Sequence, residues 1–403
     1  MSMITLPDHT DCTGCSACMI TCPKSAITMI VDEMGVLYPR IDRNLCINCG
    51  KCQKVCHLKN ELVLDRSERV YAAYSTNETE RATSASGGIA AELYNFAKSN
   101  GWHTYGVEYV HNTCSCYKEL ITEEDYQKAK NSKYVFCDSH AIYKPIKEQL
   151  TRGETVLFIG VPCQVAALIS FVGGRKDNLI LVDLLCHGTC PASYLDRHID
   201  IIEKKKNHKA EHMSFRDPLF NTHTYTFTLK DNDGVFYQAK TDQTDVYQIG
   251  YHKSLICREN CYHCKYAKEE RVGDITLSDF SGLGKLSPYN NTKQSVSCVV
   301  LSSAKGYQLF GKLIEKGMVV SERRPADEAF HYDKMFQHPT IPHKERQAFK
   351  DAYIKSADFE SSAQVALHND LIRNKTMMLL HVNEARTLAS IIKKRILHFL
   401  KMN

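Results

Sequence analysis

The sequence predicts a small α+β module, followed by an α/β domain with a mainly parallel sheet and then by a helical C-terminal tail. Three observations predict this order. Eight cysteines fall within the first sixty residues, buried-strand patterns alternate with helical patterns from residue 71 to about residue 330, and the remainder is helical and more basic. We therefore expect domains at residues 1–60, 71–330 and 331–403, with the charged segment 58–70 as a linker between the first two.

The cysteines of the first module form two runs with the same spacing. The first run is Cys12, Cys15, Cys18 and Cys22, followed by Pro23, and the second is Cys46, Cys49, Cys52 and Cys56, followed by His57. Gaps of two, two and three residues are the spacing of bacterial ferredoxins, in which three close thiolates hold one cluster and the fourth crosses to the other cluster. The spacing therefore predicts a ferredoxin-like α+β module with two [4Fe–4S] clusters. One cluster is expected on Cys12, Cys15, Cys18 and Cys56, and the other on Cys46, Cys49, Cys52 and Cys22.

A pair of structural zinc sites is the alternative interpretation, because zinc also takes closely spaced cysteines. Zinc ribbons and fingers use one or two CxxC pairs for each metal, whereas this sequence makes a run of four cysteines twice. The spacing therefore favours iron–sulfur clusters. Between the two runs, residues 26–32 and 36–41 predict two short strands around a turn at residues 33–35.

Bulk properties narrow the class of protein. The chain has 403 residues, a formal net charge of +5 and 18 cysteines. The nearly balanced charge gives no case for nucleic-acid binding. No basic start with an apolar stretch opens the chain, and no segment approaches the roughly 18 apolar residues of a membrane span. The sequence therefore predicts a cytoplasmic protein with reduced thiols, in which a disulfide framework is not expected.

Three transitions from a strand to a helix, or from a turn to a helix, organise the α/β domain. Residues 155–160 (TVLFIG) predict a buried strand before a helix at 164–171, and residues 179–185 (LILVDLL) predict another before a helix around 192–202. The turn at residues 84–88 (SASGG) opens a helix at 89–99. Residues 213–240 predict a hairpin with its turn at 231–234. In a parallel sheet the carboxyl ends of the strands share one edge, where ligand sites form.

A second group of cysteines lies far apart in this domain. Cys163 and Cys186 each follow a buried strand and precede a helix, and Cys261 and Cys264 form a CxxC pair. These four could hold a third [4Fe–4S] cluster, because helix N-termini favour negative sulfur. A redox dithiol, half of a zinc site and a pair of buried thiols are the alternatives, and the residues alone leave them open. Cys257 is either a spare thiol or an alternative ligand.

The turn at residues 84–88 is a candidate anion cradle. Small residues let backbone N–H groups approach a phosphate, and the dipole of the following helix favours its charge. Serine and glycine are also ordinary helix caps, so this signal alone is weak. No GxGxxG follows a strand, so a nicotinamide-binding Rossmann domain is not expected. Clusters move single electrons and most organic donors move a hydride, and a flavin can connect the two.

These motifs in this order resemble the family of coenzyme F420 hydrogenase/dehydrogenase beta subunits over roughly residues 1–285. Besides the double ferredoxin motif, the resemblance rests on residues 84–88 (SASGG), 132–135 (SKYV), 160–164 (GVPCQ), 183–188 (DLLCHG), 215–217 (FRD), 261–266 (CYHCKY) and 273–280 (GDITLSDF). The resemblance implies an FAD-dependent iron–sulfur oxidoreductase that exchanges electrons between an organic hydride donor or acceptor and a ferredoxin-type redox partner. A non-catalytic electron-transfer subunit of a larger redox complex is the alternative. The organic substrate stays open.

The resemblance also assigns candidate site residues. It implies that Cys163, Cys186, Cys261 and Cys264 hold the third cluster. The implied FAD contacts are Ser84, Ser86, Gly87, Gly88, Lys133 and Tyr134. Asp274 and Asp279 fall in a family motif without an assigned role.

The C-terminal tail carries an apolar stripe opposite a basic one. The stripe consists of Leu388, Ile391, Ile392, Ile396, Leu397, Phe399 and Leu400, with lysine and arginine residues on the other side. We expect this helix to dock on its own domain or on a partner protein. Contact with a membrane surface is the weaker alternative.

Overall fold

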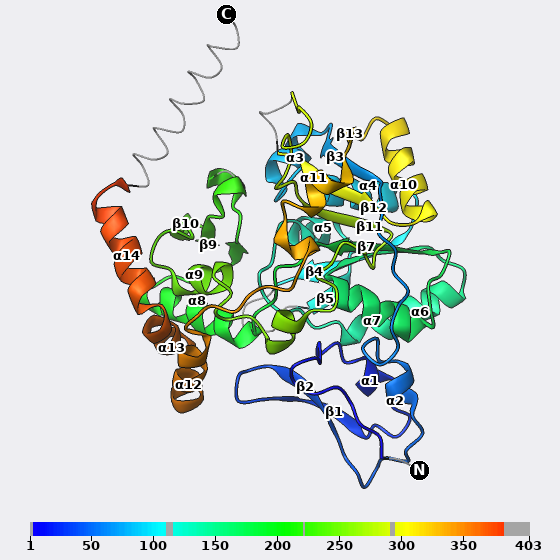
Figure 1. Ribbon diagram of the computed structural model, residues 1–403, viewed down its shortest axis with the longest axis horizontal. Coiled ribbons are helices and arrows are strands. Elements are labelled where there is room, and N and C mark those ends of the chain that lie inside the picture. The colour runs from blue at the N-terminus through cyan, green and yellow to red at the C-terminus, as the bar shows by residue number, and fades with distance from the viewer. Residues whose placement is uncertain (1–2, 110–115, 221, 291–294, 383–403) are drawn as a thin grey trace, which may run out of the picture.

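The computed structural model describes residues 3–109, 116–220, 222–290 and 295–382. Figure 1 shows the cysteine-rich module (blue) beneath helices of a larger domain built on one sheet, with a second small sheet and the C-terminal helices beside it. The predicted stripe at residues 388–400 lies outside the described residues.

The N-terminal module is a hairpin with two short helices between its cysteines. Its elements are α1 (Ala17–Ile20), β1 (Ile27–Val31), β2 (Leu37–Ile41) and α2 (Lys51–Lys54). The strands pair antiparallel, and Asp32 closes the turn by accepting hydrogen bonds from the N–H groups of Met34 (2.9 Å) and Val36 (2.8 Å). The two strands predicted at 26–32 and 36–41 are therefore confirmed.

Within the described residues, eight strands form the large sheet, in the order β13-β3-β12-β11-β7-β6-β4-β5. They are β3 (Val70–Ser75), β4 (His103–Glu108), β5 (Cys116–Glu119), β6 (Val156–Gly160), β7 (Leu179–Leu184), β11 (Ile275–Asp279), β12 (Ser297–Leu301) and β13 (Val319–Arg324). The four central strands, β11, β7, β6 and β4, run parallel. The four remaining neighbour pairs are antiparallel.

The prediction of a mainly parallel sheet was therefore wrong. The sheet is mixed, with a parallel centre and antiparallel flanks. The reason is that a continuous apolar run such as β12, which is buried at all five positions, shows burial on both faces but carries no information on strand direction.

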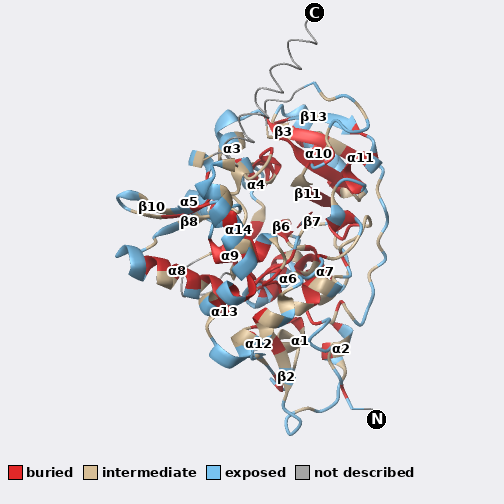
Figure 2. Ribbon diagram, turned by 60° about the vertical axis from the view of Figure 1, so that its left-hand side comes forward, coloured by how far each residue is buried: buried red, intermediate tan, exposed pale blue. Residues whose placement is uncertain are grey.

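Helices cover both faces of the sheet. On one face, α4 (Ile89–Ser99) and α10 (Ala304–Glu315) bury Leu93 and Phe310 against Leu157 and Val299. On the other face, α6 (Tyr143–Thr151) and α7 (Pro162–Val172) pack on Phe158, and α11 (Ala326–Phe330) covers the antiparallel part. Figure 2 shows buried residues along the sheet and exposed residues on the outer helix faces. The connecting elements are α3 (Glu78–Thr83), α5 (Glu123–Ala129), η1 (His140–Ile142) and η5 (Lys334–Phe336).

The strand-to-helix transitions lie where the sequence predicts them. β6 is buried at all five positions and leads through Val161 into α7, whose first residue is Pro162. Proline suits this position because its fixed φ is helical and the first turn needs no N–H there. The helix ends at Gly173, which has φ 80°. The helices predicted at 164–171, 192–202 and 89–99 are confirmed as α7, α8 and α4.

A second, three-stranded sheet packs with the C-terminal helices. It has the order β10-β9-β8 and contains β8 (His212–Ser214), β9 (Phe227–Asp231) and β10 (Gly234–Ala239), so the predicted hairpin is confirmed. The surrounding elements are α8 (Ala192–Lys206), η2 (Pro218–Phe220), η3 (Thr222–Thr224), α9 (Val246–His252), η4 (Glu259–His263), α12 (Arg346–Ser356), α13 (Phe359–Ala366) and α14 (His368–Leu379). Tyr194 of α8 stacks on Phe359 of α13 with ring centres 5.0 Å apart.

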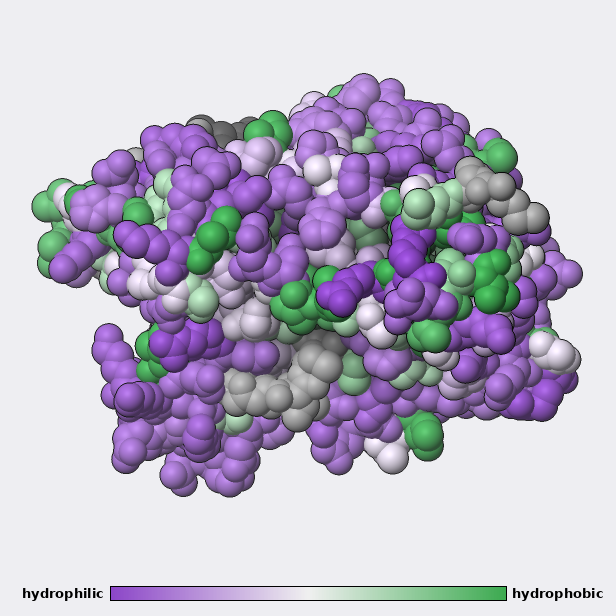
Figure 3. All heavy atoms as spheres, turned by 90° about the horizontal axis from the view of Figure 1, so that it is seen from below, coloured by the Kyte–Doolittle hydropathy of each residue, from purple (hydrophilic) through white to green (hydrophobic). Residues whose placement is uncertain are grey.

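Among the described residues there is no helix with both the length and the apolar character needed to cross a membrane. The face in Figure 3 is largely hydrophilic, and its apolar side chains lie in scattered groups.

Two glycines of α10 give a matched test of this packing. A Cβ at Gly306 would lie 2.2 Å from the Asp274 carbonyl oxygen, whereas a Cβ at Gly311 would have no atom within 4 Å. We expect Gly306→Ala to lower the free energy of unfolding by about 1–3 kcal/mol or more through overpacking. Gly311→Ala should raise it by up to about 1 kcal/mol, because alanine is the better helix former. Thermal unfolding under anaerobic conditions measures both, and equal shifts in the two variants would contradict the packing.

Candidate functional site

Two pockets in the N-terminal module gather its eight cysteines into the two predicted sets. One pocket is lined by Cys12, Cys15, Cys18 and Cys56. The other is lined by Cys22, Cys46, Cys49 and Cys52. The fourth cysteine of each run therefore crosses to the pocket of the other run, as the ferredoxin spacing predicts.

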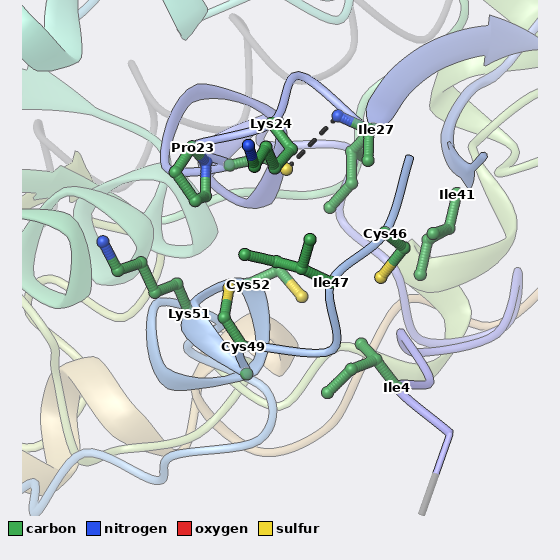
Figure 4. Close-up of a pocket in the computed structure, with 13 residues that line it drawn as sticks. Ile4, Pro23, Lys24, Ile27, Ile41, Cys46, Ile47, Cys49, Lys51 and Cys52 are labelled. Atoms are coloured by element: carbon green, nitrogen blue, oxygen red, sulfur yellow. Dashed lines mark hydrogen bonds between the residues drawn. The ribbon is translucent and has the colours of Figure 1, made fainter. Parts of the chain in front are cut away.

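Apolar side chains enclose the second of these pockets. Figure 4 shows Cys46, Cys49 and Cys52 around a space bordered by Ile4, Ile27, Ile41 and Ile47. The N–H of Ala26 donates to Cys22 Sγ at 3.3 Å, which is the dashed line in Figure 4. Apolar walls and N–H···S bonds are two means by which a protein sets the potential of a cluster.

The thiols of the first set are costly to ionise without a metal. Burial raises the pKa of Cys15 to about 12, and burial followed by repulsion from neighbouring thiols raises the pKa of Cys18 as well. Iron coordination supplies the positive charge that keeps such sulfurs as thiolates. The donor set therefore fits a thiolate-bound metal cluster.

No group of three or more His, Cys, Asp or Glu side chains within the described ranges is arranged to hold a single metal ion. A cube binds each of its thiolates through a different iron atom, so its cysteines stand around the cluster. Each cysteine set of the module likewise surrounds a pocket.

The four cysteines of the second group lie together at the carboxyl edge of the parallel strands. Cys163 is the second residue of α7, Cys186 follows β7, Cys261 lies in η4, and Cys264 follows η4 directly. Burial raises the pKa of Cys163, and repulsion from Cys264, Cys186 and Cys261 raises it further. Separate chain segments therefore bring these sulfurs close enough to oppose one another's negative charge.

Backbone amides point at two of these sulfurs. Gly188 N–H donates to Cys186 Sγ (3.4 Å), and Thr189 N–H donates to Cys261 Sγ (3.4 Å). A Cβ at Gly188, which has φ 113°, would lie 2.8 Å from Cys257 Sγ. Cys257 is therefore packed against the same loop.

One cavity of about 440 Å³ connects this cysteine group with the predicted flavin residues. Its walls include Cys163 and Cys186 as well as Ser84, Ser86, Gly88, Lys133 and Tyr134. This volume is within the usual range for cofactor pockets, about 300–1,000 Å³.

The turn at residues 84–88 presents the start of α4 to the cavity. Gly88 has φ 84°, and α4 has no side-chain hydrogen bond at its N-terminus. The amides of its first turn therefore lack the usual cap. Ser84 and Ser86 use their hydroxyl protons elsewhere, because they donate to the carbonyl oxygens of Glu80 (2.7 Å) and Val296 (3.0 Å).

Gly87 is placed differently from the rest of the turn. It does not line the cavity, and its N–H donates to Ser297 Oγ at 2.9 Å. A Cβ there would lie 2.4 Å from the Ala73 carbonyl oxygen. The glycine is thus required for close packing of the turn on β3 and β12.

Lys133 and Tyr134 line the cavity from the segment after α5. Lys133 Nζ donates to the carbonyl oxygens of Lys128 and Lys130, each at 2.6 Å, and burial lowers its pKa to about 8. The ring of Tyr134 stacks on Tyr251 with ring centres 4.4 Å apart. Lys133 therefore caps the end of α5, and Tyr134 forms an aromatic wall of the cavity.

The structure separates the roles of the two unassigned aspartates. Asp274 is buried and accepts hydrogen bonds from Leu181 N–H (2.8 Å) and Ser303 Oγ (2.7 Å), so it joins β7 to the start of α10. Asp279 lies on the cavity and pairs with Arg216 at 2.8 Å. Arg216 is buried, and its Nη2 has no hydrogen-bond partner in the described part of the chain. The sequence shows Arg216 only as the middle letter of FRD, with no sign of its burial.

Polar contacts join the N-terminal module to the larger domain beside the clustered cysteines. Tyr143 OH donates to the Cys15 carbonyl oxygen at 2.9 Å. His57 Nδ1 lies 2.5 Å from Tyr266 OH, and His57 Nε2 lies 3.1 Å from Thr13 Oγ1. Both tyrosines also lie near Cys163, whose charge acts on them. The first cysteine set and the second group are therefore neighbours across the interface.

Comparison with known proteins agrees with this arrangement. Residues 153–326 match the family model for the C terminus of the coenzyme F420 hydrogenase/dehydrogenase beta subunit, and residues 11–60 match the 4Fe-4S dicluster domain. Over residues 153–326 the chain is therefore similar to the coenzyme F420 hydrogenase/dehydrogenase beta subunits. The resemblance seen in the sequence is thus confirmed, and iron–sulfur clusters belong to this beta-subunit-like chain.

One curated relative of this F420 beta-subunit-like chain is a subunit of the F(420)H(2) dehydrogenase of Methanosarcina mazei, 22% identical over 188 residues. That match covers 44% of this chain and 54% of the relative, so the chain spans about half the length of that protein. A chain in the solved F420-reducing [NiFe] hydrogenase complex from Methanosarcina barkeri is 15% identical with a TM-score of 0.44, covering 78% of this chain and 94% of that one.

The second cysteine group gives a countable prediction. If Cys163 is a ligand, Cys163→Ala should lower the iron content from about twelve to about eight atoms per chain, because one cube of four irons is lost. Cys298→Ala is the matched control, since Cys298 is buried on β12 away from the cavity and should keep its iron. Iron and acid-labile sulfide are measured on protein purified without air. An iron content in Cys163→Ala equal to that of the control would remove Cys163 as a ligand.

Proposed function

We propose that the chain is an iron–sulfur flavoprotein that transfers electrons between [4Fe–4S] clusters and an organic hydride donor or acceptor through FAD. The observation that carries this proposal is the single cavity described above. The start of α4, with the small residues of the turn at 84–88, lines one part of this cavity, and Cys163 and Cys186 line another part. A flavin is the cofactor that connects hydride transfer to single electrons.

Residues of this chain fit FAD at several positions. The uncapped start of α4 and the turn at residues 84–88 would hold a diphosphate, because amide N–H groups and the helix dipole attract anions. Tyr134 on Tyr251 supplies a flat apolar wall. The Arg216 guanidinium, paired with Asp279, supplies a donor in Nη2 toward a polar edge of a bound molecule.

The cysteine sets suggest an order for the clusters. Cys49 is exposed, whereas Cys12 is buried and its set adjoins the larger domain. The cluster on Cys22, Cys46, Cys49 and Cys52 would therefore face a redox partner, such as a ferredoxin. The cluster on Cys12, Cys15, Cys18 and Cys56 would lie between it and the group at Cys163.

A non-catalytic electron-transfer subunit is the second candidate. It is favoured by the match to a chain that is itself named as a subunit of the F(420)H(2) dehydrogenase. In that case the clusters would be present and the hydride chemistry would belong to another chain.

Anaerobically purified protein separates the two candidates. The proposal expects heat-released FAD in about equal amount to the chain, and flavin bleaching when a hydride donor is added. Reduced coenzyme F420 is the first donor to test because the relatives are named for it. If the purified protein contains iron and sulfide but no flavin, and no hydride donor causes bleaching, the flavoprotein proposal is rejected. The chain would then be the electron-transfer subunit.

A charge placed in the turn tests where the diphosphate lies. Ala85 lines the cavity and is half-buried, so both glutamate and glutamine can be accommodated at its rim. We expect Ala85→Glu to weaken flavin binding about tenfold, roughly 1.4 kcal/mol, by repelling the phosphates. Ala85→Gln has nearly the same shape without the charge and should retain more flavin. Equal retention by the two variants, measured as flavin per chain after gel filtration, would reject the cradle.

A further inference from the structure

Arg258 lies buried between two of the three cysteine sets. It is 2% exposed, and its backbone belongs to the loop of the second cysteine group, where Cys261 N–H donates to the Arg258 carbonyl oxygen at 3.0 Å. Its side chain reaches the other way. Arg258 Nη1 donates at 2.9 Å to the carbonyl oxygen of Thr13, which stands between Cys12 and Cys15.

The charge of Arg258 has no counter-charge among the described residues. Its Nε and Nη2 atoms are buried and have no hydrogen-bond partner there. The adjacent carboxylate, Glu259, pairs instead with Arg346 (3.5 Å) and Lys350 (3.6 Å). An arginine keeps its proton in a protein, and leaving a buried charge without a partner is strongly unfavourable. A bound anionic group beside Arg258 would supply the counter-charge that no carboxylate of the described residues supplies.

The guanidinium of Arg258 lies beside residues of both cysteine sets. One face lies over the ring of Phe136 at 4.1 Å. A Cβ at Gly14, which has φ 63°, would lie 2.6 Å from Nη2, so the Cys12–Cys15 loop passes directly against the guanidinium. Arg258 also lines the cavity together with Cys163 and Cys186.

We propose that Arg258 is the shared counter-charge of two [4Fe–4S] clusters, the one on Cys12, Cys15, Cys18 and Cys56 and the one on Cys163, Cys186, Cys261 and Cys264. The proposal rests on the cluster assignment of the proposed function. Four thiolates carry more negative charge than the iron–sulfide core carries positive charge, so each ligated cluster is an anion. Reduction adds one more negative charge. A fixed cation between the clusters therefore favours the reduced form of both and raises both potentials together.

The test compares Arg258→Lys, which keeps the charge, with Arg258→Gln, which removes it. Each protein is purified without air, iron and labile sulfide are counted, and the clusters are titrated with EPR detection. In Arg258→Gln we expect the midpoint potentials of the two neighbouring clusters to move to more negative values. The cluster on Cys22, Cys46, Cys49 and Cys52, which does not adjoin Arg258, is the internal control, and its potential should move least. In Arg258→Lys all three should stay near the wild-type values.

The other possible results for iron content and midpoint potential also support or reject the proposal. Loss of iron in Arg258→Gln with full iron in Arg258→Lys supports the same requirement for charge. Unchanged potentials in Arg258→Gln, or equal iron loss in both variants, would overturn the proposal, because charge would then not be what matters. A wild-type count of about eight irons would remove the cluster on Cys163, Cys186, Cys261 and Cys264, and with it the shared role, whereas heat-released FAD tests the proposed function separately. Full wild-type iron with unchanged potentials in the variants defeats only the role of Arg258.

Discussion

Burial of thiols is the physical constraint on which this structure depends. Burial raises the pKa of Cys15 and Cys261 to about 12, so a thiolate at either place needs positive charge from a metal. Loops hold two sets of four cysteines around small pockets and bring a further group of four together, and backbone amides are directed at several of the sulfurs. The backbone beside these cysteines takes left-handed turns at Gly14, Ser16 and Gly50.

The second consequence of the same constraint is the fixed position of the N-terminal module. Its hydrogen bonds with the larger domain include several near the first cysteine set. Tyr143 and Arg258 donate to the carbonyl oxygens of Cys15 and Thr13, and the His57 ring bonds to the Tyr266 hydroxyl. His57 stands where the ferredoxin pattern often has a second proline, and a proline there would have no ring nitrogen to meet Tyr266. This departure from the motif is explained by the interface.

Much of this arrangement could be predicted from local signals. The regular cysteine gaps define both pockets of the module, and the strand before Pro162 and the turn before Ile89 are correctly placed. Sheet direction could not be predicted, because an apolar strand such as β12 looks the same in either direction. Gly87 belongs to the right turn but serves packing on β3. Arg258 and Arg216 gave no signal, since burial of a single arginine depends on contacts between distant segments.

The central claim is that three cysteine sets hold three iron–sulfur cubes. Anomalous X-ray scattering at the iron and zinc edges, from crystals grown without air, tests it most directly. The account predicts three separate iron peaks, two within the N-terminal module and one between Cys163, Cys186, Cys261 and Cys264. Zinc peaks at the module, or no metal beside Cys163, would contradict it.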